Sequence, residues 1–195
     1  QLEVATARRS GTKAVRELAD SQEEGDALLG ADGWTGKQRR ILRSKAPLAA
    51  HYLKPSLKWD ARLGAMRDGV LIQLPYEVVW TLFERLFEGQ YSLVVRDLAH
   101  DSEEVMGVGT NAEGKKADDA PGRIFYARAT VQITIHLPNG HAPRVYEGVG
   151  VSYGDVKLDR TGNVHAINNA RRTAEKGAVQ DAKREALTHI GQVFR

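Results

Sequence analysis

The residues best suited to bind a ligand in this sequence are basic side chains spaced along a segment near its C-terminal end. Arg172, Lys176 and Lys183 recur at helical spacing, which places them within about 40° of one another around a helix axis. Such an edge can follow a row of phosphates, because each cation that neutralises a phosphate releases bound counterions. Arginine also offers paired donors to phosphate oxygens and stays charged at any working pH. The chemistry predicted is binding of a polyanion.

Two glycine-rich stretches approach nucleotide-binding motifs but lack a required residue. The segment Gly109–Lys116 (GTNAEGKK) has the glycines and lysine of a phosphate-binding loop, but Lys116 stands where Ser or Thr must hold magnesium. Two aspartates follow closely and would repel nucleotide phosphates. In Gly148–Tyr153 (GVGVSY), Tyr153 stands where a dinucleotide-binding fingerprint needs its third glycine. We therefore predict no nucleotide cofactor.

The histidines, carboxylates and serines of the sequence indicate no catalytic or metal site. The six histidines show no zinc-ligand spacing, and no paired carboxylates stand out. Ser152 lies in Val-Ser-Tyr, outside any nucleophile elbow. The chain has no cysteine, which excludes disulfides, thiolate metal sites, iron–sulfur clusters and a cysteine nucleophile. We predict neither an enzyme nor a metal-binding protein.

Charge is distributed in blocks along the chain. Its 28 Lys and Arg residues against 25 Asp and Glu give a net charge of only +3. Eight basic residues and one acidic residue lie in 34–62, and eight basic against four acidic lie in 157–195. Residues 97–119 have seven acidic residues and two basic ones. Blocks of this kind are typical either of a patchy solvated surface or of anion-binding segments, and the pattern alone leaves both open.

Strands are predicted mainly in the second half of the chain. Apolar and polar residues alternate from Phe125 to Leu137, which indicates a strand with one buried face. The turn residues at 138–140 (PNG) and renewed alternation over 144–153 predict a β-hairpin. Further strands are predicted at 91–97 and 70–74. Residues 101–122, rich in Gly, Asp, Glu and Lys, are predicted to form an exposed loop.

Helices are predicted on both sides of these strands. Apolar residues recur at helical spacing between Pro75 and Gly89, a typical start and stop. Residues 164–193 lack proline and are rich in Ala, Lys, Arg, Glu and Gln, which predicts a long helix. A third helix is predicted at 12–29, followed by a linker at 30–36. The expected fold class is α+β, with a three-stranded antiparallel β-sheet and flanking helices in a β-β-β-α core.

Two segments of this core carry a family resemblance. Glu147–Ser152 (EGVGVS) closes the third strand, and Lys176–Arg184 (KGAVQDAKR) runs through the last helix. This combination resembles the Rad-fifty-two family of single-strand annealing and recombination-mediator proteins, in which a Gly-Val-Ser strand end precedes a helix reading Lys-Gly-Ala-Val-Thr-Asp-Ala-Leu-Lys-Arg-Ala. The resemblance extends over residues 57–194 and includes the segment 60–64 (DARLG). It implies a domain that assembles into rings and holds single-stranded DNA in a basic outer groove.

The resemblance also implies individual contact residues. Arg62 falls on the family's DNA-contacting arginine, and Arg184 falls on a groove lysine of the Lys-Arg pair in the helix. Glu185 replaces the second base of that pair, and Thr188 stands where some members have another arginine, so two charges of the groove are missing. Lys183, Lys176 and Arg172 could compensate along the same helix, and Lys157 and Arg160, just after the hairpin, are a loose match to a basic segment of the family.

The function implied is ATP-independent binding of single-stranded DNA and annealing of complementary strands in homologous recombination or DNA repair. Residues 51–195 would form the DNA-binding and oligomerisation domain, and residues 1–50 a basic, partly helical extension. The implied partners are further copies of the chain in a ring and a recombinase or single-strand-binding protein. The implied location is intracellular and DNA-associated, in a nucleoid, nucleus or organelle. No membrane partner is expected, because no apolar run is long enough to cross a bilayer.

An alternative function follows from the charge blocks alone. The basic segments could instead serve a non-catalytic adaptor that binds an acidic protein or double-stranded nucleic acid. The segment Lys37–Lys45 fits either function, whereas the basic residues that coincide with the family motifs favour annealing. Loss of strand binding without loss of assembly, after substitution of Arg62 or Arg184, would separate annealing from the adaptor function. The acidic segment 97–119 and residues 1–50 have no assigned role.

Overall fold

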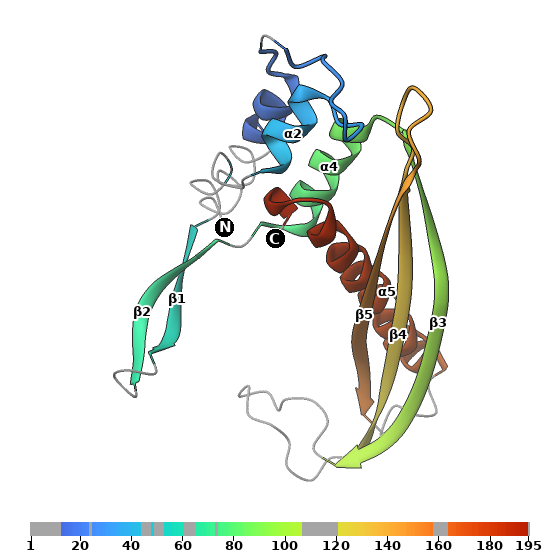
Figure 1. The fold of residues 1–195 in the computed structure, drawn as a ribbon. Helices are drawn as coiled ribbons and strands as arrows, with labels where there is room; N and C mark the ends of the chain where they lie inside the picture. Colours follow the sequence, from blue (N-terminus) through green and yellow to red (C-terminus); the bar gives the residue numbers. More distant parts are fainter. Residues whose placement is uncertain are drawn as a thin grey trace. The chain divides into compact units, whose positions relative to one another are not determined.

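A computed structural model describes residues 13–23, 25–43, 48, 53–60, 65–72, 74–106, 121–157 and 164–194. The chain divides into two compact units, whose elements are labelled in Figure 1. The sheet unit comprises residues 91–136 and 143–189, and the helical unit comprises residues 1–90, 137–142 and 190–195.

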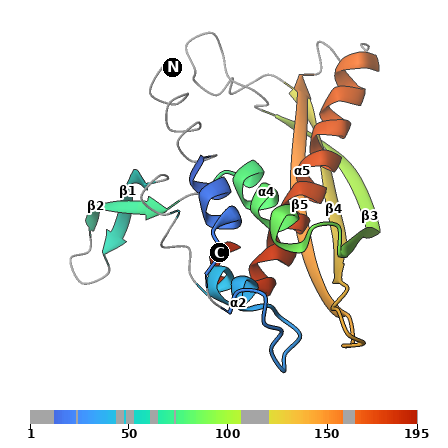
Figure 2. The same cartoon turned by 90° about the horizontal axis from the view of Figure 1, so that it is seen from above.

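The sheet unit is a three-stranded antiparallel sheet with one long helix packed along it (Figures 1 and 2). Its strands are β3 (Tyr91–Met106), β4 (Pro121–Ile135) and β5 (Arg144–Lys157), in the order β3-β4-β5. The helix, α5 (Val164–Ile190), belongs to this unit except for its last residue. The α+β class and the three-stranded antiparallel sheet are therefore confirmed.

The hairpin between β3 and β4 is longer than predicted. The ladder continues through the segment predicted as a loop, from the pair Asp101↔Tyr126 to the pair Met106↔Pro121. Cross-strand side chains support this extension, because the Tyr126 hydroxyl donates to Glu103 and Arg123 pairs with Glu104. The loop prediction is thus wrong for residues 101–106 and 121–122, and residues 107–120 lie outside the described part.

The two strands next to α5 bury different kinds of residue. On β4, the alternating apolar face is fully buried, as predicted, from Ala127 to Ile135. On β5, the residues on the buried side include three glycines and Val156, while the other valines and Tyr153 face the opposite side of the sheet. Val151 and Tyr153, for example, are 62% and 65% exposed. The glycines that face α5 are Gly148, Gly150 and Gly154.

Glycine on β5 lets α5 lie unusually close to the sheet. A Cβ built on Gly150 would stand 2.1 Å from the carbonyl oxygen of Ala178 and 2.2 Å from the backbone nitrogen of Ala182. The helix meets this row with an alanine at every fourth position, all buried: Ala170, Ala174, Ala178, Ala182 and Ala186. The helix–sheet contact is therefore backbone against backbone.

The helical unit contains α2 (Gly36–Leu42), α4 (Tyr76–Phe87), a helical segment at 13–20 and the short 3₁₀ helix η2 (Gln192–Phe194). It also contains an antiparallel hairpin of β1 (Leu53–Asp60) and β2 (Ala65–Ile72). The predicted strand at 70–74 covers only the end of β2. The sequence LKPSLKWD of β1 alternates apolar and polar residues, but it includes a proline, which weakens the strand signal.

The predicted helix at 12–29 is shorter in the structure, with helical backbone at 13–20. Local polar contacts replace the helix beyond this point. The Ser21 hydroxyl donates to the Leu18 carbonyl, the Glu23 N–H donates to the Asp26 carboxylate, and Gly25 has a φ of 82°. The last helix, predicted to extend to residue 193, ends at Ile190 and is followed by the separate η2.

The stretch 30–36, predicted as a linker, is a closed turn. The Gly30 N–H donates to the Trp34 carbonyl at 2.8 Å, and the Trp34 side chain is buried. Thr35 then caps α2 in a capping box with Gln38. Among the described helices, none combines the length and the apolar character needed to span a membrane.

Candidate nucleic-acid interface

The basic residues predicted on the last helix lie on the sides of α5 that do not pack on β5. The alanine row fixes the orientation of α5, because these residues must face the glycines of the strand. Arg172 and Lys176 are exposed, and Lys183 is half-buried. Ideal helix geometry separates Arg172 and Lys183 by about 16 Å along the axis. Arg184 is half-buried and lies about 100° further around the helix than Lys183.

The acidic side chains of α5 are all engaged in other contacts. Glu175 pairs with Nε of Arg171 at 3.0 Å, and Glu185 pairs with Nε2 of His189 at 3.4 Å. Oδ2 of Asp181 accepts a hydrogen bond of 3.3 Å from the backbone N–H of Val151 on β5. The three carboxylates of α5 are therefore bound to Arg171, His189 and the Val151 N–H rather than to Arg172, Lys176 or Arg184.

The basic residues of α5 differ in their contacts. Arg171 is bound to Glu175 and also lies 2.5 Å from Nε2 of His100 on β3, so it links the helix to the sheet. The ion pairs between described residues include none with Arg172, Lys176 or Arg184. Exposed cations without a carboxylate partner can exchange their counterions for phosphates.

Lys157, at the end of β5, lies in a polar groove of about 510 Å³. One wall is formed by β5 from Tyr153 to Lys157, and the other by α5 residues including Asn169 and Thr173. The Thr173 hydroxyl donates to the backbone carbonyl of Asn169 at 2.8 Å. Sequence analysis did not identify this groove, since Asn169 and Thr173 form no motif and meet β5 only through the fold.

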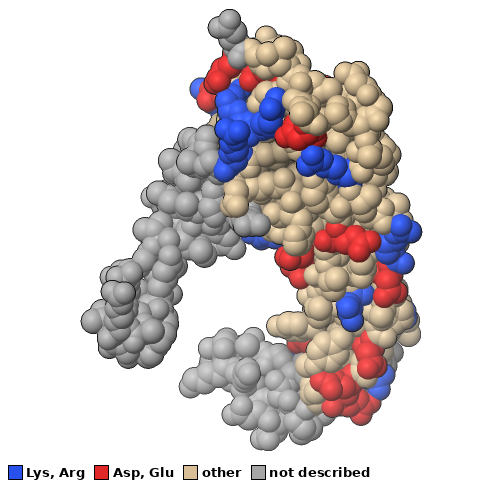
Figure 3. All heavy atoms as spheres, viewed as in Figure 1, with Lys and Arg blue, Asp and Glu red and all other residues tan. Residues whose placement is uncertain are grey.

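The structure therefore brings Lys157 next to the first turns of α5, with Arg172, Lys176, Lys183 and Arg184 further along the helix. Arg62 and Arg160 lie outside the described residues. Figure 3 shows that Asp and Glu side chains gather over the end of β3. In the part of the chain that the structure describes, no three His, Cys, Asp or Glu side chains come together as a possible metal site.

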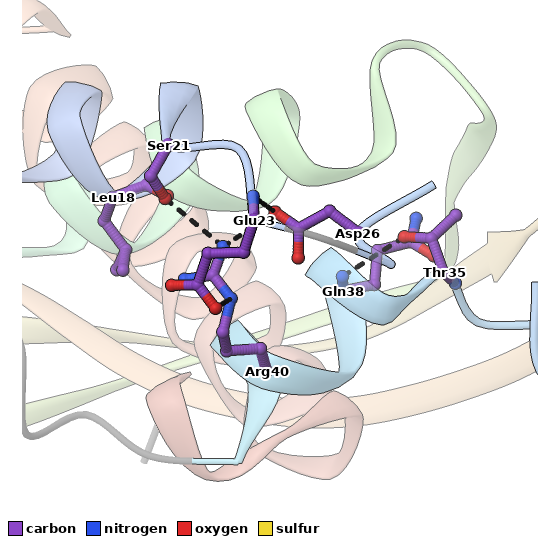
Figure 4. Close-up of polar contacts among 7 residues, drawn as sticks. All are labelled: Leu18, Ser21, Glu23, Asp26, Thr35, Gln38 and Arg40. Atoms are coloured by element: carbon purple, nitrogen blue, oxygen red, sulfur yellow. Dashed lines mark hydrogen bonds and ion pairs between the residues drawn. The ribbon is translucent and has the colours of Figure 1, made fainter. Parts of the chain in front are cut away.

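The helical unit has a second group of basic residues, on α2, where Figure 3 shows Lys and Arg side chains gathered. The central cation, Arg40, is held by acidic neighbours (Figure 4). Its Nη2 donates to Asp26 at 2.9 Å, while its Nε lies 3.2 Å from Glu23 at an angle too bent for a hydrogen bond. The hydrogen bond from Arg40 lowers the pKa of Asp26, against a smaller opposing effect of desolvation. Arg40 is thus a structural cation, whereas Arg43 at the helix end is exposed.

In comparisons with known proteins, no protein-family model matches the chain and no curated sequence is significantly similar to it.

Proposed function

We propose that this chain binds single-stranded DNA and anneals complementary strands without ATP, as a ring-forming protein of the Rad-fifty-two type. The observation that supports this most is the contact between the two segments that carry the resemblance. Gly150 of the strand segment lies against Ala178 and Ala182 of the helix segment. A Cβ on Gly177 would stand 2.2 Å from the hydroxyl oxygen of Ser152. The small residues of both motifs thus meet in one interface.

The charge distribution on α5 supports the same proposal. The interface turns Arg172 and Lys176 away from β5, while the carboxylates of α5 are engaged elsewhere. Cations along a helix edge would hold the phosphates of a single strand without reading its sequence, giving salt-sensitive binding. Bases left free on such a strand can pair with a complementary strand, so annealing would need no chemical step.

The adaptor alternative would use the basic residues of the helical unit. Arg40 contributes little to such a surface, because Asp26 and Glu23 already neutralise it. This leaves Arg43 and the half-buried Arg39 and Lys37 as the described cations of α2 that could meet an acidic partner. We therefore favour α5 as the principal anion-binding element.

The test is an ATP-free annealing assay with two labelled complementary oligonucleotides, run across a salt series. The variants are Arg184→Ala, Arg62→Ala and the double change Arg172→Ala with Lys176→Ala. Lys13→Ala, which removes one exposed cation of the helical unit, is the matched control. We expect the intact protein to speed pairing at low salt. Each lost phosphate contact should lower the slope of log affinity against log salt by about one, and the control should leave it unchanged.

Arg39→Ala with Arg43→Ala forms the second arm of the experiment. If these changes abolish binding while the α5 changes do not, the adaptor function replaces annealing. If the intact protein neither binds single strands nor speeds their pairing at low salt, the proposal is wrong.

A further inference from the structure

One free edge of the sheet is partly closed by the helix packed beside it. In the order β3-β4-β5, β5 pairs with β4 on one side only. The hydrogen bond from the Val151 N–H goes to Asp181 of α5. An added strand would need backbone donors of this kind to form its ladder. Asp181 therefore occupies one of the backbone N–H donors that an added strand would need at the β5 edge.

The close approach of α5 explains how a short side chain reaches the strand. Gly150, the neighbour of Val151, has no Cβ, and a Cβ built there would lie 2.9 Å from the backbone carbonyl carbon of Asp181. Asp181 thus stands at a point where the helix and strand backbones are in close contact. In sequence it stands beside Ala182 of the buried row and is itself exposed, so its carboxylate can reach the strand from the side of the helix.

The edge is open on one side of this contact. The groove of about 510 Å³ lies along β5 from Tyr153 to Lys157, two residues beyond Val151. The opposite edge of the sheet is more accessible, because β3 is exposed from Val94 to Glu104. The contact that Arg171 of α5 makes with β3 goes to the His100 side chain rather than to the strand backbone. The two edges of the sheet therefore differ in their readiness to accept another strand.

The charges of the two edge strands determine which strand can be added. β3 has four acidic residues and one basic residue, Arg96, so two β3 strands placed side by side would repel each other. β5 has two acidic and two basic residues and no net charge. The edge of β5 is therefore the better partner for the β3 edge of a second copy. Both strands run opposite to β4, so copies related by rotation would join them in parallel and head to tail.

We infer that Asp181 is a guard on the β5 edge: it holds the Val151 N–H in the free chain and is displaced when the β3 edge of a second copy is added. This inference rests on the ring of the proposed function. The guard raises the protein concentration needed for assembly and limits edge-to-edge association of free chains. Assembly then depends on the contacts of the whole interface rather than on one exposed strand.

Sedimentation velocity over a protein concentration series, without DNA, tests the guard. We expect Asp181→Ala to assemble at a concentration about tenfold lower than the intact protein. In this variant no hydrogen bond between the Val151 N–H and a carboxylate has to break before another strand can pair. Asp181→Asn keeps an acceptor oxygen and should lie in between. Glu185→Gln removes the same charge one turn later on α5, where the carboxylate pairs with His189, and should behave like the intact protein.

A second change shows whether assembly uses the freed edge. Val151→Pro removes the donor itself, and proline is tolerated on an edge strand where the N–H faces outward. Added to Asp181→Ala, it should cancel the gain in assembly while circular dichroism stays native. Hydrogen exchange at the Val151 amide, measured at concentrations where the chain is monomeric, should be slow in the intact protein and faster in Asp181→Ala.

The outcomes separate the guard from the proposed function. Equal assembly of the intact protein and Asp181→Ala, including no assembly of either, would overturn the guard, as would equal exchange at Val151. If Asp181→Ala assembles more readily but neither protein binds single-stranded DNA, the guard stands and the annealing proposal fails. If both anneal DNA with unchanged assembly, only the guard fails.

Discussion

Each of the two units has its own kind of internal packing, and the two kinds are opposite. In the sheet unit, α5 and β5 meet through glycine and alanine, with backbone atoms in direct contact. In the helical unit, large aromatic rings meet: Phe83 lies 4.9 Å from Phe87 and 6.3 Å from Phe194 between ring centroids, and Trp34 lies 5.4 Å from Phe87. The sheet unit is therefore sensitive to added atoms, and the helical unit to removed ones.

This difference also explains where functional groups are exposed. Glycines on the inner face of β5 leave the helix close enough for Asp181 to contact the strand. The same close packing fixes the rotation of α5 and hence the direction of its basic residues. The aromatic cluster of the helical unit instead places Gln38 against α4, where its side-chain amide donates to the Leu86 carbonyl at 3.1 Å.

Gly150→Val should have the largest effect on stability. The added side chain would meet backbone atoms of Ala178 and Ala182, which cannot rotate away. Overpacking typically costs about 1–3 kcal/mol where the neighbouring side chains can move, and backbone contacts on two sides, which cannot move, place this change well above that range. We expect α5 to separate from β5, measured as loss of hydrogen-exchange protection in the sheet unit.

The matched control for this change is Val149→Leu, on the same strand but facing the exposed side. It should leave protection in the sheet unit unchanged. A Gly150→Val protein with native protection of α5 would contradict the close backbone packing described above.

Phe83→Ala should have the next largest effect, in the helical unit. Phe83 is fully buried and touches the ring cluster on two sides, so truncation leaves a cavity. Loss of a buried phenylalanine typically costs about 3–5 kcal/mol in unfolding free energy. Denaturant unfolding measures the loss, and Phe83→Leu should recover much of it. Equal destabilisation by both substitutions would show that packing volume is not the cause.

Local signals in the sequence predicted part of this fold. Three predictions rest on signals within a few residues, and each is confirmed. They are the proline and glycine that bound α4, the turn at 138–140 and the alternation on β4. Asn139 and Gly140 have φ values of 58° and 75°, as the turn residues there indicate. The extension of β3 past Asp101 could not be predicted from the sequence, because its acidic composition is typical of a loop and its pairing depends on β4.

The candidate interface was also predictable only in part, where local spacing within one helix decides it. Helical spacing predicted one edge for Arg172, Lys176 and Lys183, and the structure has an unbroken helix there. The contact of Asp181 with Val151 was not predictable, because it depends on how closely Gly150 lets two distant segments approach. Binding of DNA by these residues stays a prediction.

Thr35→Ala should have a smaller effect, confined to the helical unit. The Thr35 hydroxyl accepts from the Gln38 N–H at 3.2 Å, and the Gln38 side chain accepts from the Thr35 N–H at 2.9 Å. Loss of such a cap typically costs about 1 kcal/mol. Thermal unfolding measures the loss, and Thr35→Ser should retain nearly all of the stability. If the serine variant loses as much as alanine, the hydroxyl cap is not what stabilises α2.

The smallest expected effect is a pH dependence at Asp26. The hydrogen bond from Arg40 lowers the pKa of this carboxyl in the folded chain below its ordinary value of 3.8. The carboxylate therefore stabilises the fold fully above about pH 4, and the contribution is lost as the pH falls through the lowered pKa. Asp26→Asn should lower the thermal midpoint by about 1–2 °C near neutral pH and by less as the pH falls below 4.

Asp155→Asn is the control for this last comparison, since it removes an exposed carboxylate from the sheet unit. The difference between its thermal midpoint and that of the intact chain should not follow the same pH course. The intact chain has other carboxylates that titrate in acid, so only the change in the difference between proteins reports on Asp26. A difference for Asp26→Asn that stays constant from neutral pH to pH 3 would mean that Arg40 stabilises the turn through its other partners, Ser21 and Glu23, rather than through charge on Asp26.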